Sequence, residues 1–154
     1  SGKVNGTLLQ QLNTLSYYQQ PFPKSLANSF GVDTVYPLIK KAGLTIPDAL
    51  CTYVEHIALQ IKNALFTEVT LSNAQLFVTG GGALNTYLIE RLKAIVSEKG
   101  IEVVVPDERL VQYKEALVMA LLGALRWREE ATVLSSVTGA TANSVGGALW
   151  LGRL

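Results

Sequence analysis

The 154-residue sequence has few residues of the kinds that bind metals or form cross-links. Cys51 is the only cysteine, so no disulfide can form within the chain, and a single thiol is typical of a protein from the reducing cytoplasm. Because Cys51 lies within an apolar helical pattern, we expect a buried, unreactive thiol. His56 is the only histidine, which excludes a metal site built from several histidines and favours a structural role.

Charged residues are also scarce, at 16% of the chain, and they balance to a formal net charge of +1. No long basic or acidic run occurs, which argues against nucleic acid or an anionic membrane surface as a partner. The longest apolar stretch, residues 116–125, is too short to span a bilayer, and no signal peptide is visible at the start. The length predicts one domain over residues 1–154, and the 49% hydrophobic content predicts that this domain is well packed.

Three successive glycines stand in the sequence FVTGGGALN, residues 77–85, directly after an apolar run. Glycine loses more backbone freedom on folding than any other residue, so three in a row destabilise a fold unless something requires them. Two interpretations are open at this point. Either the turn is merely tight, or a ligand has to approach the backbone closely.

The segments around the glycines predict alternating strands and helices. Residues 76–79 form a β-prone run, and residues 84–95 carry a leucine stripe of helical spacing that Gly100 would end. Residues 101–105 are expected to form a second strand, covered on both faces. A third helix is expected to open at 114–115 and to be buried over 116–125. This order implies a parallel crossover, and hence an α/β fold with helices packed on a sheet.

Two amphipathic helices are predicted nearer the start of the chain. The first, within residues 8–18, would be broken by the prolines at 21 and 23. The second begins at Thr45-Ile46-Pro47-Asp48, where Thr45 can cap and Pro47 suits the first turn. Apolar residues then recur at steps of three and four over about five turns. They are Leu50, Val54, Ile57, Ile61 and Leu65.

The place of the glycine turn, between a strand and a helix, favours a ligand site over a plain turn. In open α/β sheets, ligands bind outside the carboxyl ends of the strands. Missing Cβ atoms let a flat or anionic group lie against the main chain, and the helix N-terminus behind it favours negative charge. The pattern is neither a P-loop nor the dinucleotide fingerprint, because no Gly-Lys-Ser/Thr follows and Gly80, Gly81 and Gly82 are adjacent.

Strand, GGGA turn, helix and apolar strand together resemble the nucleotide-side half of sugar kinases in the actin-like ATPase superfamily, whose domains are ribonuclease H-like. Four motifs also occur in the order seen in the anhydro-N-acetylmuramic acid kinase family. They are Pro23-Lys24-Ser25, TGGGALN at 79–85, KEALVMALLG at 114–123 and SVTGA at 136–140. The resemblance covers nearly the whole chain. It implies the carboxyl-terminal, nucleotide-side lobe of a two-lobed kinase, with a mixed sheet flanked by helices.

The same resemblance implies roles for individual residues. The nucleotide-binding set would be Gly80, Gly81, Gly82, Ala83 and Asn85, with main-chain contacts at the glycines. Asn85 would reach the ribose or cap the helix. The set implied near the phosphates or the interdomain cleft is Lys24, Ser25, Glu115, Thr138 and Gly139. Simpler roles stay open for these: a solvated loop lysine at 24, a carboxylate complementing the helix dipole at 115, and a plain connection at 138–139.

The resemblance implies that the complete protein is a sugar kinase of cell-wall recycling. It also implies that this kinase forms homodimers. Such an enzyme uses ATP, Mg²⁺ and water to open the anhydro ring of 1,6-anhydro-N-acetylmuramic acid and to phosphorylate the sugar. Two departures limit what this chain can do alone. Leu26-Ala27-Asn28 replaces a Thr-Gly-Arg-like sequence, so that arginine contact cannot be assumed.

The second departure is the absence of the catalytic motifs. The family's amino-terminal half carries a Ser-Gly-Thr-Ser-like phosphate loop and the aspartate that acts as general base, and neither of these two motifs occurs in these 154 residues. Most of the amino-sugar pocket also belongs to that half. We therefore predict no catalytic residue in this chain and no activity for it alone. Two alternatives remain open: a domain of another carbohydrate kinase of the superfamily, and a non-catalytic module whose glycines only form a tight turn.

Overall fold

The computed structural model describes residues 2–21, 23–66, 74–150 and 152. The chain divides into two compact units: unit 1 comprises Ser1–Gln20 and Leu26–Asp107, and unit 2 comprises Pro21–Ser25 and Glu108–Leu154. A single domain over the whole chain stays a prediction. Within the described ranges, no helix combines the length and the apolar character that crossing a membrane requires.

Unit 1 begins with short helices that bury a small leucine cluster. Asn5 caps the first of them, because its side-chain oxygen accepts a hydrogen bond of 2.9 Å from the Leu8 amide. Leu8 and Leu12 are buried together with Val35. The elements are α1 (Gly6–Asn13), α2 (Ser16–Gln19), the π-helical turn η1 (Gly31–Val35) and α3 (Tyr36–Lys41). The helix predicted within 8–18 is therefore present, but extended backbone at Leu15 splits it.

The longest helix of unit 1, α4 (Ile46–Phe66), begins where its capping residues predict. The Thr45 hydroxyl donates to Asp48 Oδ2 at 2.8 Å and accepts from the Asp48 amide at 3.3 Å, which closes the first turn. Val54 and Ala58 of α4 are buried in the main core. Leu50, which the apolar stripe places inside, is 59% exposed and is a correction to that prediction.

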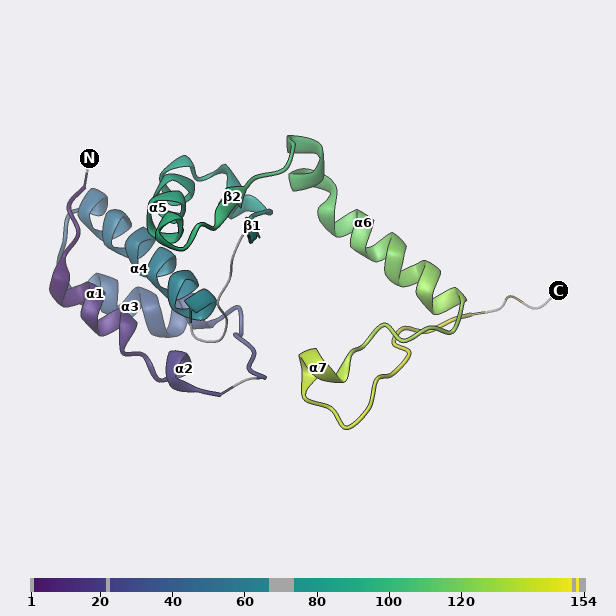
Figure 1. The fold of residues 1–154 in the computed structure, drawn as a ribbon. Helices are drawn as coiled ribbons and strands as arrows, with labels where there is room; N and C mark the ends of the chain where they lie inside the picture. The colour runs from purple at the N-terminus through teal and green to yellow at the C-terminus, as the bar shows by residue number, and fades with distance from the viewer. Residues whose placement is uncertain (1, 22, 67–73, 151, 153–154) are drawn as a thin grey trace. The chain divides into compact units, whose positions relative to one another are not determined.

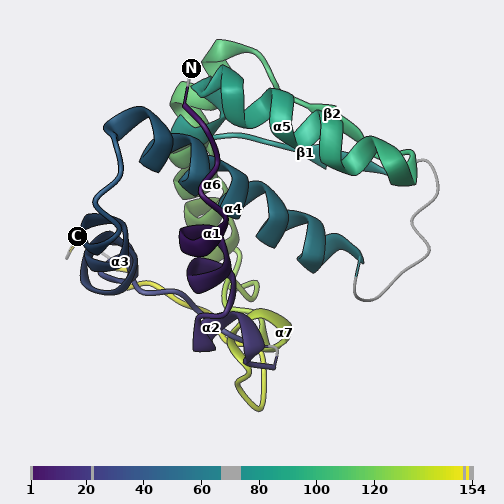
Figure 2. The same cartoon turned by 90° about the vertical axis from the view of Figure 1, so that its left-hand side faces the viewer.

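The main core of unit 1 lies between α4, α5 (Thr86–Val96) and a two-stranded sheet (Figures 1 and 2). Strands β1 (Gln75–Phe77) and β2 (Glu102–Val104) are parallel, with Leu76 opposite Val103, and α5 is the crossover between them. The α/β class and the parallel crossover are thus confirmed, in a mostly helical form with a small sheet. An actin-like arrangement stays a proposal.

The second strand is covered less completely than its sequence predicts. Val103 is buried against the main core, whereas Val105 is 38% exposed and Phe77, on the neighbouring strand, is 54% exposed. The expectation of cover on both faces is therefore wrong for the described residues of this chain. The cause is the size of the sheet, because two strands and the helices of one layer shield only one face.

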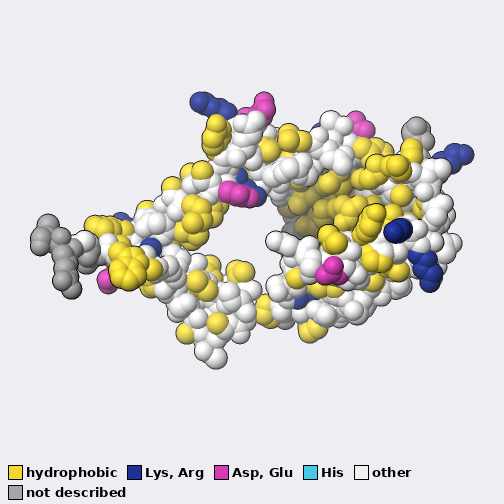
Figure 3. Space-filling view, turned by 180° about the vertical axis from the view of Figure 1, so that it is seen from behind, with side chains coloured by type: hydrophobic (Ala, Val, Ile, Leu, Met, Phe, Trp, Pro, Cys, Tyr) yellow, Lys and Arg dark blue, Asp and Glu magenta, His cyan; other side chains and the backbone are white. Residues whose placement is uncertain are grey.

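Unit 2 consists of a long helix, α6 (Glu108–Trp127), a short helix, α7 (Ser135–Thr138), and connecting loops. The helix α6 begins well before the predicted start at Lys114. Its apolar stretch is also not buried, which corrects the second part of that prediction: hydrophobic side chains are visible along this segment (Figure 3). Leu117, Val118, Met119 and Leu121 are 45–67% exposed. A single helix with one further turn of helix lacks a second layer that could cover them.

Candidate functional site

The glycine turn is a 3-10 turn that only glycine can begin. Gly80 has φ 78° and ψ −174°, a region of backbone conformation that is essentially restricted to glycine. The residues Gly81–Leu84 then form the turn η2, in which the Ala83 amide donates to Gly80 O at 3.0 Å and the Asn85 amide to Gly82 O at 3.1 Å. The first glycine is therefore required by backbone geometry alone.

The other two glycines leave bare peptide open at the surface. Gly81 and Gly82 are exposed, a Cβ added at Gly81 would meet no atom within 4 Å, and one added at Gly82 would meet only Leu88 Cδ2, at 4.0 Å. Local packing therefore does not explain glycine at position 81. The Ala83 side chain is buried, and its amide is used inside the turn. The peptides available to a ligand are those of Gly81 and Gly82.

Asn85 caps the helix that follows the turn. Its Oδ1 accepts a hydrogen bond of 3.1 Å from the Leu88 amide at the start of α5. Of the two roles that the sequence left open for Asn85, the capping role is present in the structure. Leu88, Leu92 and Ile95 are buried along the inner face of α5, as their spacing predicts, whereas Leu84, the first residue of that stripe, precedes α5 and is 65% exposed. The 3-10 turn η3 (Ser97–Lys99) follows α5, and Gly100 ends it in the left-handed conformation.

A hollow of about 400 Å³ borders Asn85, between the start of α5 and the first half of α4. Across it, Cys51 Sγ lies 3.2 Å from the Tyr87 hydroxyl, and this hydrogen bond raises the pKa of Tyr87. Cys51 is buried, as predicted. The wall of the hollow is mostly apolar and consists of Gly2, Pro47, Leu50, Cys51, Val54, Asn85 and Tyr87.

An ion pair lies one helical turn farther along the same two helices. Arg91 Nε and Nη2 donate to the two carboxylate oxygens of Glu55 at 2.7 and 2.8 Å, which raises the pKa of Arg91. Both residues border a second hollow of about 430 Å³ that shares Cys51 and Tyr87 with the first. The sequence analysis did not single out these four residues. Cys51 and Glu55 on α4, like Tyr87 and Arg91 on α5, nevertheless have the i, i+4 spacing of neighbours on one helix face.

The chemistry of the turn suits a neutral, planar group better than a phosphate. Residues 74–90 contain no lysine or arginine, and Arg91 is already paired with Glu55. The open peptides and the apolar hollow can hold the base or ribose of a nucleotide, whereas a triphosphate would need cations from elsewhere. The described residues of this chain also bring no three acidic, histidine or cysteine side chains together as a metal site.

The predicted cleft residues lie in unit 2, where the structure brings two of their segments together. A Cβ added at Gly139 would lie 2.8 Å from Pro23 Cγ, so the loop of Lys24 and Ser25 passes close to the end of α7. Gly139 has φ +74°, and the Thr138 hydroxyl donates to Leu134 O at 3.0 Å. The Thr138 side chain is thus engaged in its own turn, and a ligand-facing role for this turn stays a proposal.

Glu115 does not have the position that the sequence gives it. It lies in the interior of α6, exposed, and not in the first turn of that helix, where Glu108 stands instead. The idea that the Glu115 carboxylate complements the dipole at a helix start is therefore wrong, since the effect falls off within the first turn.

His56 has the structural role that the sequence favours. Its ring is buried, with Nε2 2.9 Å from the Tyr18 hydroxyl and Nδ1 2.6 Å from the Asn13 side-chain oxygen. Because an amide oxygen only accepts, Nδ1 carries the proton and Nε2 accepts from Tyr18. Burial lowers the pKa of His56 to about 4, so the ring is neutral at pH 7.

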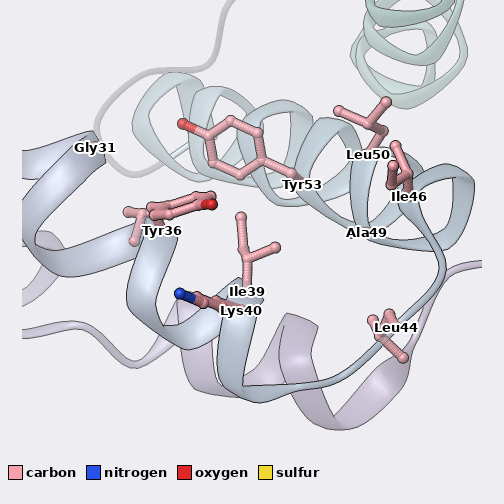
Figure 4. Close-up of a pocket in the computed structure, with 10 residues that line it drawn as sticks. Gly31, Tyr36, Ile39, Lys40, Leu44, Ile46, Ala49, Leu50 and Tyr53 are labelled. Atoms are coloured by element: carbon pink, nitrogen blue, oxygen red, sulfur yellow. The ribbon is translucent and has the colours of Figure 1, made fainter.

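A third hollow, of about 500 Å³, lies between α3 and α4 and contains none of the predicted site residues. The rings of Tyr36 and Tyr53 stand on two sides of it, and Lys40 lies at its edge (Figure 4). The remaining wall is apolar and includes Val35, Ile39, Leu44, Ile46, Ala49 and Leu50.

The comparison with known families covers both units and the glycine turn. The sequence model of the family "Anhydro-N-acetylmuramic acid kinase" matches residues 1–152. The chain belongs to the anhydro-N-acetylmuramic acid kinase family.

Curated members of the anhydro-N-acetylmuramic acid kinase family from three bacteria show the same relationship over almost the whole chain. The protein from Hydrogenovibrio crunogenus is 32% identical over 97% of this chain, that from Saccharophagus degradans 28% over 97%, and that from Coxiella burnetii 29% over 99%. In each case the chain spans 41% of the length of the relative. All the predicted site residues, from Lys24 to Gly139, lie inside the family match.

Proposed function

We propose that this chain is the carboxyl-terminal, nucleotide-side part of an ATP-dependent kinase that opens the anhydro ring of 1,6-anhydro-N-acetylmuramic acid and phosphorylates the sugar. Family membership supports the kinase class. The observation that carries the nucleotide assignment is the exposed peptide at Gly81 and Gly82. Asn85, at the end of the same turn, also lines an apolar hollow. We propose an actin-like, ribonuclease H-like arrangement for the complete lobe, a cytoplasmic location and a homodimer, all from the family resemblance.

The roles that we propose for the two units follow from the predicted site residues that each unit contains. In unit 1, the open turn would bind the adenosine part of ATP through main-chain groups, with the Asn85 side chain held as a cap. ATP, when bound, supplies the phosphoryl group, and Mg²⁺ would be held by its phosphates and by residues outside this chain. The loops at Lys24-Ser25 and Thr138-Gly139 are our candidates for the cleft side, and Glu115, which is exposed on α6, is a further candidate.

The reacting groups are expected in the part of the family polypeptide that these 154 residues do not include. In this proposal, the remaining lobe brings the phosphate loop, the general base and the sugar pocket, and closure of two lobes assembles the site. The chain alone would then bind nucleotide without turnover. Incubation with ATP, Mg²⁺ and the anhydro sugar is expected to yield no sugar phosphate, and clear turnover would contradict this division.

A further inference from the structure

The hydroxyl of Thr79 is the one buried side-chain polar atom in the described part of the chain that has no hydrogen-bond partner. Thr79 follows Val78, whose amide donates a hydrogen bond of 2.9 Å to Val104 O at the end of the sheet. It precedes Gly80, which has a positive φ. A buried hydroxyl without a partner destabilises the folded state, and native proteins contain few of them. Its place, at the carboxyl end of β1 beside open peptide, points to a ligand.

We propose that the Thr79 hydroxyl forms a hydrogen bond with the nucleoside part of the bound nucleotide after the glycine turn has shifted. This inference rests on the proposed nucleotide site. A shift is needed because Oγ1 is covered in the free chain. Three successive glycines allow it, since peptide rotation at these positions moves no side chain. The free turn therefore holds Thr79 unpaired, and the nucleoside supplies the missing partner.

The surroundings of Thr79 select the nucleoside over the phosphates. Residues 74–90 bring no basic side chain, and the neighbouring Leu76 and Val78 pack against the main hydrophobic core. A triphosphate bound to this segment would lose its hydration and would gain no cationic side chain from residues 74–90, which is unfavourable. A ribose hydroxyl or a base edge is neutral and matches a group that can both donate and accept one hydrogen bond.

The test replaces Thr79 by two residues that separate its hydroxyl from its shape. Thr79→Val keeps the volume and removes the hydroxyl, whereas Thr79→Ser keeps the hydroxyl. We expect Thr79→Val to raise the thermal midpoint of the free chain, because it removes an unpaired buried polar group. We expect Thr79→Val to weaken the binding of both ATP and adenosine by about tenfold, which corresponds to the loss of one hydrogen bond. We expect Thr79→Ser to keep the wild-type affinity.

The outcomes that overturn the inference are distinct from failure of the proposed function. If the wild-type chain binds ATP and Thr79→Val binds it equally well, the inference alone is wrong. A loss confined to ATP, with adenosine unaffected, would overturn the nucleoside assignment, and a lower midpoint for Thr79→Val would show that the hydroxyl is already paired. If the wild-type chain binds neither ligand, the proposed function fails and this inference fails with it.

Discussion

Arg91 and Glu55 join α5 to α4 through two parallel hydrogen bonds, at 2.7 and 2.8 Å. The two side chains are 34% and 14% exposed, so the pair is partly shielded from water. Since α5 begins directly after the glycine turn, the pair fixes the helix that carries the turn against the longest helix of unit 1. A planar guanidinium is needed for this geometry, because an ammonium group cannot form two parallel bonds to one carboxylate.

Replacing Arg91 by glutamine is expected to destabilise unit 1 by about 1–2 kcal/mol, because a partly buried carboxylate loses two charge-assisted hydrogen bonds. Urea unfolding followed by circular dichroism measures the change. The matched control is Glu98→Gln, which breaks the more exposed pair of Lys62 and Glu98. That change is expected to cost less than about 0.5 kcal/mol. Equal effects of the two variants would contradict a special role for the Arg91 pair.

The buried His56 predicts a specific loss of stability in acid. Its pKa of about 4 in the folded chain lies below the ordinary value of 6.5, so between these values the unfolded chain binds a proton that the folded chain does not. The titration of His56 therefore leaves the free energy of unfolding almost unchanged above pH 6.5 and lowers it as the pH drops toward 4, by up to about 3 kcal/mol. Unfolding curves at several pH values across this window measure the slope.

The control for this prediction is His56→Gln, which removes the titrating ring. This variant is expected to be less stable at pH 7, because the Tyr18 and Asn13 hydrogen bonds are disturbed, but to show a flatter dependence between pH 6.5 and 4. Asp48 is expected to add little to the pH dependence of the free energy of unfolding between pH 6.5 and 4. The hydrogen bond from the Lys3 amide lowers its pKa below the ordinary 3.8, so its contribution is lost only at lower pH. An unchanged slope in His56→Gln would assign the acid loss to other groups.

The short distance between Pro23 and a Cβ added at Gly139 predicts opposite effects of alanine at two glycines of unit 2. Gly139→Ala places a Cβ 2.8 Å from Pro23 Cγ on a residue with φ +74°, and is expected to destabilise the unit by about 1–3 kcal/mol. Gly123 lies inside α6 with open space around it, so Gly123→Ala is expected to stabilise by about 0.5–1 kcal/mol. Thermal unfolding of both variants measures the difference, and a neutral Gly139→Ala would contradict the close approach.

The parts of the fold that the sequence predicts correctly are those set by local chemistry. The start of α4 follows from Thr45 and Asp48, and the strand, turn, helix and strand around the glycines follow from periodicity and from Gly100. These signals act over a few residues, so they need no knowledge of the tertiary structure. The open peptide at Gly81 was likewise predictable from the choice of glycine itself.

The errors arise where burial depends on partners distant in the sequence. Periodicity places Leu50 and the 116–125 stretch inside, but whether an apolar face is covered depends on which layers this chain supplies. The early start of α6 had a local signal that was overlooked. Pro106 and Asp107 end a strand and equally introduce a helix whose apolar spacing begins at Leu110. The pairing of Cys51 with Tyr87 and of Glu55 with Arg91 joins two helices and has no signal in either alone.

Nucleotide titration of the wild-type chain beside Gly81→Leu tests the central claim, that bare peptide in the glycine turn binds the nucleoside. Gly81 faces open space and has no left-handed backbone, so leucine is expected to leave unfolding cooperative and only to cover the peptide. Gly123→Leu, a second glycine with open surroundings, is the control. With millimolar ATP, we predict amide NMR shifts concentrated at residues 79–86 in the wild type and in Gly123→Leu, and none in Gly81→Leu. Absence of shifts in the wild type, or equal binding by a folded Gly81→Leu chain, would contradict the account.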